Sequence, residues 1–125
     1  MAAKRVLIAE DSSVIQNLTR KILIIQNFEI DAVKDGEKVL SKLEKKKYDV
    51  IIMDINMPKM DGMECARQIR SNKDPEIANL PIIAISGNAK NYTEEDFKTV
   101  GFNDYLQKPL DFDFLVDTVK KYTDQ

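Results

Sequence analysis

Short apolar runs alternate along the chain with longer segments in which apolar residues recur every three or four positions. The runs are rich in β-branched residues and largely apolar throughout, which is typical of strands that are buried on both faces of a sheet. We expect such strands at residues 6–9, 29–33, 50–53, 82–85 and 102–106. The longer segments between them have the spacing of amphipathic helices.

The first helix is expected to begin near Ser12 or Ser13, either of which is a suitable N-cap. Its apolar residues at helical spacing, which we expect to face the core, are Val14, Leu18, Ile22 and Ile25. Leu23 and Ile24 lie off this face, so we expect them to be partly exposed.

Capping residues bound the later helices. The third helix is expected over residues 63–71. Thr93 is a suitable N-cap for the fourth helix, Gly101 is well placed to end it, and Asp111 is a suitable N-cap for the last. The residues expected to face inward are Cys65, Ala66 and Ile69 in the third helix, and Phe112, Leu115, Val116, Val119 and Tyr122 in the last. Strand and helix thus alternate five times, which predicts an α/β fold with a parallel sheet covered by helices on both faces.

Composition and charge narrow the class of protein. The 125 residues fit a single domain, residues 1–125, and the net charge of −2 is too balanced to indicate nucleic-acid binding. The first apolar run is too short for a signal peptide, and no stretch approaches the length of a membrane span. We therefore expect a cytoplasmic protein that contacts no membrane.

The chain has no histidine, which excludes histidine-dependent triads, the common zinc ligand sets and a phosphohistidine of its own. Cys65, the single cysteine, is expected to be a reduced, packed thiol.

Polar side chains follow four of the expected strands at the point where each strand ends. Glu10 and Asp11 follow the first, Asp54 the third, Ser86 the fourth and Lys108 the fifth. Ligands of open α/β sheets bind outside the carboxyl ends of the strands. Any one of these residues alone is more simply explained as a cap, a turn residue or a surface polar group. Their joint position favours one functional rim.

The chemistry of this rim suits a phosphoryl group and a divalent metal. Three carboxylates without a cation would repel one another, whereas Mg²⁺, or Mn²⁺ in its place, binds carboxylate and carbonyl oxygens. Asp54 would be the nucleophile that forms an aspartyl phosphate. Lys108 would pair with the incoming charge, and Ser86 and the N–H of Gly87 would donate hydrogen bonds to phosphoryl oxygens.

Four segments carry a resemblance that covers residues 4–122: VLIAEDSS, VIIMDINMPKMDGMECARQIR, PIIAISGNA and DYLQKPL. They resemble the response-regulator receiver domains of two-component signalling. The resemblance implies a flavodoxin-like (βα)5 fold with strand order 2-1-3-4-5. It implies that Asp54 is the phosphoacceptor, and that Asp11, Glu10, Asp54 and the carbonyl of Asn56 hold the metal.

Further roles follow from the same resemblance. Ser86 would be the switch hydroxyl, Tyr105 the coupled aromatic that swings inward, and Lys108 the basic residue, joined to Pro109 by a cis bond. The side chains of Asn56 and Asn88 would tune how fast water attacks the acyl phosphate. In this sequence Glu10 stands where the family more often has Asp, which keeps the carboxylate but lengthens its arm.

The resemblance also implies partners. A histidine kinase or a histidine phosphotransfer protein would supply the phosphoryl group and would dock near the first helix. From their expected exposure we propose Leu23 and Ile24 as part of that docking surface; the alternative, that these two residues pack under neighbouring loops, is equally consistent with the sequence. A second surface around Tyr105 would bind an unknown downstream target, and the unphosphorylated protein would be a monomer that catalyses only its own phosphorylation and dephosphorylation. One alternative is a receiver that forms part of a hybrid kinase or larger regulator.

Two other functions fit less well. An aspartate-nucleophile phosphatase needs a second acid two residues after the nucleophile, and Asn56 cannot transfer protons. A flavodoxin-like carrier of a flavin phosphate conflicts with the acidic rim.

Overall fold

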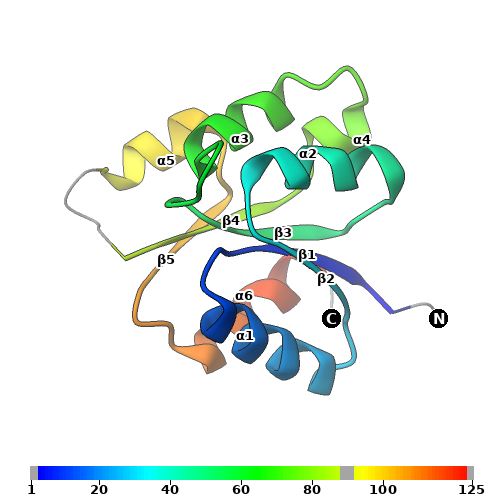
Figure 1. Ribbon diagram of the computed structural model, residues 1–125, viewed down its shortest axis with the longest axis vertical. Helices are drawn as coiled ribbons and strands as arrows, with labels where there is room; N and C mark the ends of the chain where they lie inside the picture. The colour runs from blue at the N-terminus through cyan, green and yellow to red at the C-terminus, as the bar shows by residue number, and fades with distance from the viewer. Residues whose placement is uncertain (1–2, 88–91, 124–125) are drawn as a thin grey trace.

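The computed structural model describes residues 3–87 and 92–123 and contains a five-stranded parallel sheet (Figure 1). The strands lie in the order β2-β1-β3-β4-β5, so the flavodoxin-like fold and its strand order are confirmed. The strands are β1 (Arg5–Ala9), β2 (Glu29–Val33), β3 (Val50–Asp54), β4 (Ile82–Ser86) and β5 (Asp104–Gln107). The last begins two residues later than the sequence predicts, because Phe102 is buried and its N–H closes the preceding helix on the carbonyl of Phe97.

Helices cover both faces of the sheet. Figure 1 shows α1 (Ser13–Ile25) and α6 (Phe112–Thr123) side by side on one face. The other face carries α2 (Gly36–Lys45), α3 (Gly62–Arg70), α4 (Pro75–Ala78) and α5 (Glu94–Val100). The short α4 was not predicted. It is a single turn capped by Asp74 that places Pro75 at its start, where a missing N–H does no harm.

The central strand β3 is buried on both sides, as its apolar run predicts. Ile51 and Met53 pack in the layer beneath α2 and α3, whereas Val50 and Ile52 pack in the layer beneath α1 and α6. The residues expected to face inward from α3, Cys65, Ala66 and Ile69, are all fully buried. Leu115, Val116 and Val119 of α6 are buried too, with Phe112 and Tyr122 packed against them.

The predicted caps form as expected. Thr93 and Asp96 make a reciprocal capping box at the start of α5, and Asp111 accepts a hydrogen bond from the N–H of Phe114 in the first turn of α6. Gly101 ends α5 with a φ of 115°, which a residue without a Cβ adopts at low cost. These caps fix where β5 and its following loop approach the end of β4.

Helix α1 corrects the sequence prediction. Leu23, expected to be partly exposed, is fully buried against the sheet, while Val14, Leu18 and Ile25, expected in the core, are 69%, 46% and 79% exposed. Ile24 is half exposed, as expected. The helix has apolar residues on two opposite sides, and helical spacing alone does not tell which side meets the sheet.

Within the described residues, no helix has the length and apolarity needed to cross a membrane.

Candidate functional site

Three carboxylates converge at the carboxyl ends of β1 and β3. Glu10, Asp11 and Asp54 each offer an oxygen, and these oxygens all lie within 4.8 Å of one another. Glu10 and Asp54 are buried, and Asp11 is exposed at the mouth of the cluster. The three side chains therefore lie close together, as expected for residues that follow parallel strands at the same edge of a sheet.

The turn after β3 holds Asp54 in place. The N–H of Asn56 donates to Oδ1 of Asp54 at 3.1 Å, and the N–H of Gly62 donates to the carbonyl of Ile55. Gly62 packs against this backbone so closely that a Cβ built on it would lie 2.6 Å from the carbonyl oxygen of Asp54. A glycine is therefore required where α3 begins, and its presence lets the loop fold back over the end of β3.

Lys108 reaches the acids from the opposite side of the rim. Its Nζ lies 3.0 Å from Oδ2 of Asp54 and 3.2 Å from Oε1 of Glu10. The N–H of Lys108 donates to the carbonyl of Ser86, which ties the loop after β5 to the end of β4, and the Lys108–Pro109 peptide bond is cis. Lys108 is thus anchored at its backbone while its ammonium bridges two strands.

Burial and neighbouring charges change two pKa values at this site. Burial raises the pKa of Glu10 to about 7, and the neighbouring carboxylate of Asp54 adds to the rise, whereas the N–H of Ser12 opposes it. Burial by itself would lower the pKa of Lys108, but its hydrogen bond to Asp54 and the charges of Asp54 and Glu10 raise it above its ordinary value. The single ammonium therefore leaves the acids without full compensation.

This donor set fits a hard divalent cation. Carboxylate oxygens at this separation suit Mg²⁺, which binds oxygen ligands and keeps several waters, and the exposure of Asp11 leaves one side of the cluster open to them. A second positive charge would also offset the repulsion from Asp54, which adds to the effect of burial on the pKa of Glu10.

Comparison with known proteins decides the family. The sequence matches the response regulator receiver domain family over residues 6–120. The chain belongs to this family. Among the relatives of this receiver domain, the CAI-1 autoinducer sensor kinase/phosphatase CqsS of Vibrio cholerae serotype O1 is 36% identical over 116 residues, which are 93% of this chain and 17% of that protein. The polar-differentiation response regulator DivK of Brucella anthropi is 28% identical, with 95% of each chain covered.

Solved structures agree with this assignment. The receiver domain of the sensor histidine kinase PA1611 from Pseudomonas aeruginosa PAO1, described with a magnesium ion coordinated in its active site cleft, has a TM-score of 0.88 and 30% identity. That comparison covers 99% of this receiver domain and 100% of the other chain. The chemotaxis response regulator CheY4 of Vibrio cholerae has a TM-score of 0.86 and 28% identity, covering 96% and 98% of the two chains.

The other predicted residues that the structure describes lie at or after the ends of β3 and β4 or in β5. Ser86 ends β4 and is buried, and Gly87 follows it in an exposed position. A Cβ built on Gly87 would lie 3.5 Å from Cδ of Lys108, so the glycine lies beside the lysine side chain. Asn56 is exposed beside Asp54, and Asn88 lies outside the described residues. The ring of Tyr105 stacks on Phe97 at 4.5 Å, and its buried hydroxyl has no hydrogen-bond partner among the described residues. This aromatic, expected to swing inward, is already packed inward in this structure.

Sequence reasoning missed Gln16. Its side-chain amide contacts the backbone at the ends of β1 and β2, directly behind the acidic turn. A glutamine in a helix is an ordinary polar residue, so nothing in the sequence distinguishes it.

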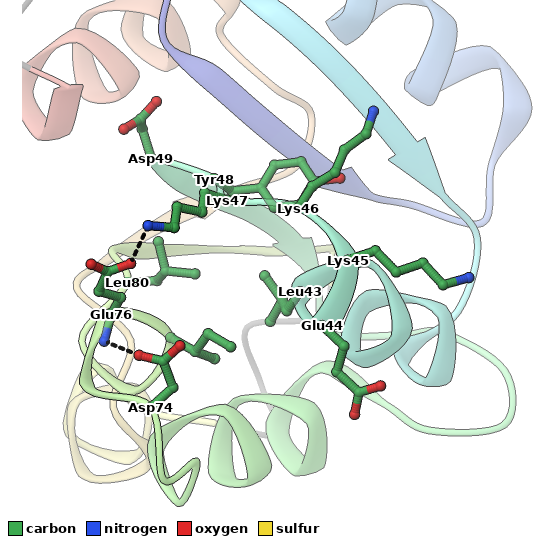
Figure 2. A pocket seen from close by; sticks show the side chains of 11 residues that line it. Leu43, Glu44, Lys45, Lys46, Lys47, Tyr48, Asp49, Asp74, Glu76 and Leu80 are labelled. Carbon is green, nitrogen blue, oxygen red and sulfur yellow. Dashed lines mark hydrogen bonds and ion pairs between the residues drawn. The ribbon is translucent and has the colours of Figure 1, made fainter.

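A hollow on the receiver domain lies at the other end of the sheet. It measures about 560 Å³ and lies between the end of α2 and α4, next to Tyr48 and Asp49, which precede β3 (Figure 2). The ion pair of Lys47 with Glu76 bridges it at 3.1 Å. Because it lies at the amino ends of the strands, this hollow takes no part in the acidic rim.

Proposed function

We propose that this receiver domain accepts a phosphoryl group on Asp54 from a phosphohistidine of a partner protein, in a reaction that depends on Mg²⁺. The observation that carries the proposal is the contact of Lys108 with Asp54 at 3.0 Å inside the cluster of Glu10, Asp11 and Asp54. A carboxylate nucleophile, a cation and open metal ligands are the groups that phosphoryl transfer needs at one place.

The chemistry follows from the roles of the side chains. A carboxylate oxygen of Asp54 attacks phosphorus, the bond from phosphorus to the imidazole nitrogen breaks, and the leaving imidazole takes up a proton from solvent. Glu10, Asp11, Asp54 and the carbonyl of Asn56 would hold Mg²⁺, with Mn²⁺ as a substitute of similar chemistry. The bound ion would supply positive charge that stabilises the oxygens of the transferring group.

Other residues of the rim act on the product. Lys108 moves from the carboxylate to a phosphoryl oxygen, because the phosphoryl group carries more negative charge than the carboxylate that it replaces. Ser86 and the N–H of Gly87 donate hydrogen bonds to the same group. Reorientation of Ser86 then alters the packing of Tyr105 and with it the surface of α5 and β5, where an unknown target binds.

The exposed side of α1 is proposed as the docking surface of the phosphohistidine donor. Val14, Leu18 and Ile25 form one exposed apolar stripe along the helix, which begins directly after the metal-binding turn. Phe114, in the first turn of the neighbouring α6, is 57% exposed. An exposed apolar stripe of this kind marks an interaction site. The earlier placement at Leu23 is wrong because that residue is buried, while Ile24 lies on the flank of the stripe.

The biological setting follows the family. As a switch, the domain would catalyse only its own phosphorylation and dephosphorylation, in the cytoplasm, as a monomer before phosphorylation and as a single unit over residues 1–125. The length of the sensor kinase relative, of which this chain spans 17%, supports the second possibility of a receiver within a hybrid kinase or larger regulator.

The test uses a small phosphodonor such as acetyl phosphate with Mg²⁺ and measures intact mass. The wild type should gain one phosphoryl group, and Asp54→Asn should gain none. The reaction should stop when a chelator removes Mg²⁺. Labelling that persists in Asp54→Asn would place the acceptor elsewhere and refute the proposal.

A further inference from the structure

The side chain of Gln16 joins the ends of two strands behind the metal-binding turn. Its Nε2 donates to the carbonyl of Glu10 at 3.0 Å and to the carbonyl of Val33 at 2.9 Å. Both N–H bonds of the amide are therefore used, and both acceptors are backbone groups. Gln16 reaches them from the first turns of α1, six residues after Glu10.

The two carbonyls lie at the point where the sheet ends, and the carbonyl of Glu10 lies beyond it. β1 ends at Ala9 and β2 at Val33, and the N–H of Glu10 makes the final bond between the two strands, to the carbonyl of Val33 at 3.0 Å. Beyond that point the chains separate into their loops. The carbonyl of Val33 therefore accepts from Gln16 as a second donor, whereas the carbonyl of Glu10, beyond the last strand bond, receives from Gln16 the donor that a neighbouring strand would supply.

The same turn carries the metal ligands. Glu10 is fixed at its N–H by Val33, at its carbonyl by Gln16 and at its carboxylate by the N–H of Ser12, which donates to Oε2 at 3.1 Å. Asp11, the next residue, is exposed, and the structure shows no hydrogen bond to its carboxylate among the described residues. The direction of its side chain therefore depends on the peptide that Gln16 holds.

We propose that Gln16 is a positioning residue for the metal site, which orients the Glu10–Asp11 turn so that both carboxylates face Asp54. This inference rests on the proposed Mg²⁺-dependent function. Groups that orient metal ligands from behind affect metal affinity by about tenfold or more when they are removed. Gln16 differs from such groups only in that it binds the backbone of the ligand residues, whereas such groups bind the ligand side chains.

The experiment measures the Mg²⁺ dissociation constant of the whole chain by following amide chemical shifts in an NMR titration. Gln16→Met keeps the shape of the side chain and removes both donors, so we expect the dissociation constant to rise about tenfold. The matched control is Leu23→Val, which destabilises the same helix from a buried position near its other end. We expect its affinity to stay within about twofold of the wild type.

The outcomes separate the two proposals. If Gln16→Met binds Mg²⁺ as tightly as the wild type, or if Leu23→Val weakens binding equally, Gln16 has no positioning role. A wild type that does not bind Mg²⁺ at all would overturn the proposed function together with this inference. If Gln16→Met does not fold, Gln16→Asn replaces it, because its shorter amide cannot reach both carbonyls, and the same rise in the dissociation constant is expected.

Discussion

The ammonium of Lys108 lies 3.0 Å from Oδ2 of Asp54 and comes from a loop 54 residues further along the chain. The same nitrogen contacts Glu10 at 3.2 Å, so one cation serves two buried carboxylates. A buried acid that has lost its cation is strongly destabilising, because the charge cannot be solvated. The stability of the unphosphorylated domain therefore depends on Lys108 and on the protonation of Glu10.

Replacing Lys108 with methionine tests this dependence. Without Mg²⁺, we expect Lys108→Met to lower the free energy of unfolding by about 2 kcal/mol at pH 8, less than for a fully buried pair because the lysine side chain is partly exposed. At pH 5 the loss should be smaller, since Glu10 is then protonated. Urea denaturation at the two pH values gives the comparison. Lys59→Met, which removes an exposed lysine 3.9 Å from Asp35, should change stability little at either pH.

The raised pKa of Glu10 predicts an unusual pH profile. Between its unfolded value of 4.5 and its folded value of about 7, the folded state binds more protons than the unfolded state. Stability without metal should therefore fall as the pH rises through this window, by up to about 3 kcal/mol. No histidine is present to titrate there. Melting temperatures measured from pH 4.5 to 7.5 with a chelator would show the fall.

Glu10→Gln provides the control for this profile. The amide cannot ionise, so the variant should keep a nearly constant stability across the same window. Mg²⁺ should bind the wild type more weakly at pH 5.5 than at pH 7.5, because protons compete for Glu10. A wild-type profile as flat as that of Glu10→Gln would show that Glu10 titrates normally.

The sequence was sufficient for the sheet and for the rim, but not for the contacts behind them. Strand ends located Asp54 and Lys108 because parallel strands finish at one edge regardless of side-chain detail. The buried side of α1 was misjudged because Leu18 and Leu23 are equally apolar, and only the packing of the sheet selects between them. Gln16 was missed because its role depends on two carbonyls that come together in space where two strands end, which no local pattern records.

Arg70 is another residue whose role depends on distant parts of the chain. Its guanidinium donates to the carbonyls of Gly101, Ala78 and Leu80 and to Oδ1 of Asn103, which joins α3 to the loops before β4 and β5. We expect Arg70→Lys to lower the free energy of unfolding by about 2–4 kcal/mol, because an ammonium cannot reach all of these acceptors. Urea denaturation measures this loss.

The control for Arg70 lies one turn earlier on the same helix. Arg67 is exposed and makes only an ion pair with Glu64 in the described structure, so Arg67→Lys should change stability by less than about 0.5 kcal/mol. Equal effects of the two substitutions would mean that the hydrogen bonds of Arg70 contribute nothing beyond a surface charge.

The side chain of Asn56 is predicted to set the lifetime of the phosphorylated state. It is exposed beside Asp54, and an amide can orient an attacking water without acting as a strong base. Asn56→Lys should lengthen the lifetime severalfold, because an ammonium cannot accept a hydrogen bond from that water. Loss of the phosphoryl group after removal of the donor is followed by intact mass. Asn17→Lys adds the same charge at an exposed position of α1 and should leave the rate unchanged.

The last prediction concerns the two exposed sides of α1. Leu18 and Ile24 are exposed to a similar extent, 46% and 50%, but only Leu18 lies on the stripe with Val14 and Ile25. If the stripe receives the donor, Leu18→Asp should slow phosphotransfer from the cognate phosphohistidine protein by about tenfold or more, because a charge would be buried in an apolar contact. Phosphorylation by acetyl phosphate should be unchanged, since it needs no docking surface. Ile24→Asp introduces the same charge on the flank of the helix and should affect neither reaction. A loss confined to Ile24→Asp would move the docking surface to the side of α1 that faces β2, and equal loss with acetyl phosphate would show damage to the rim itself.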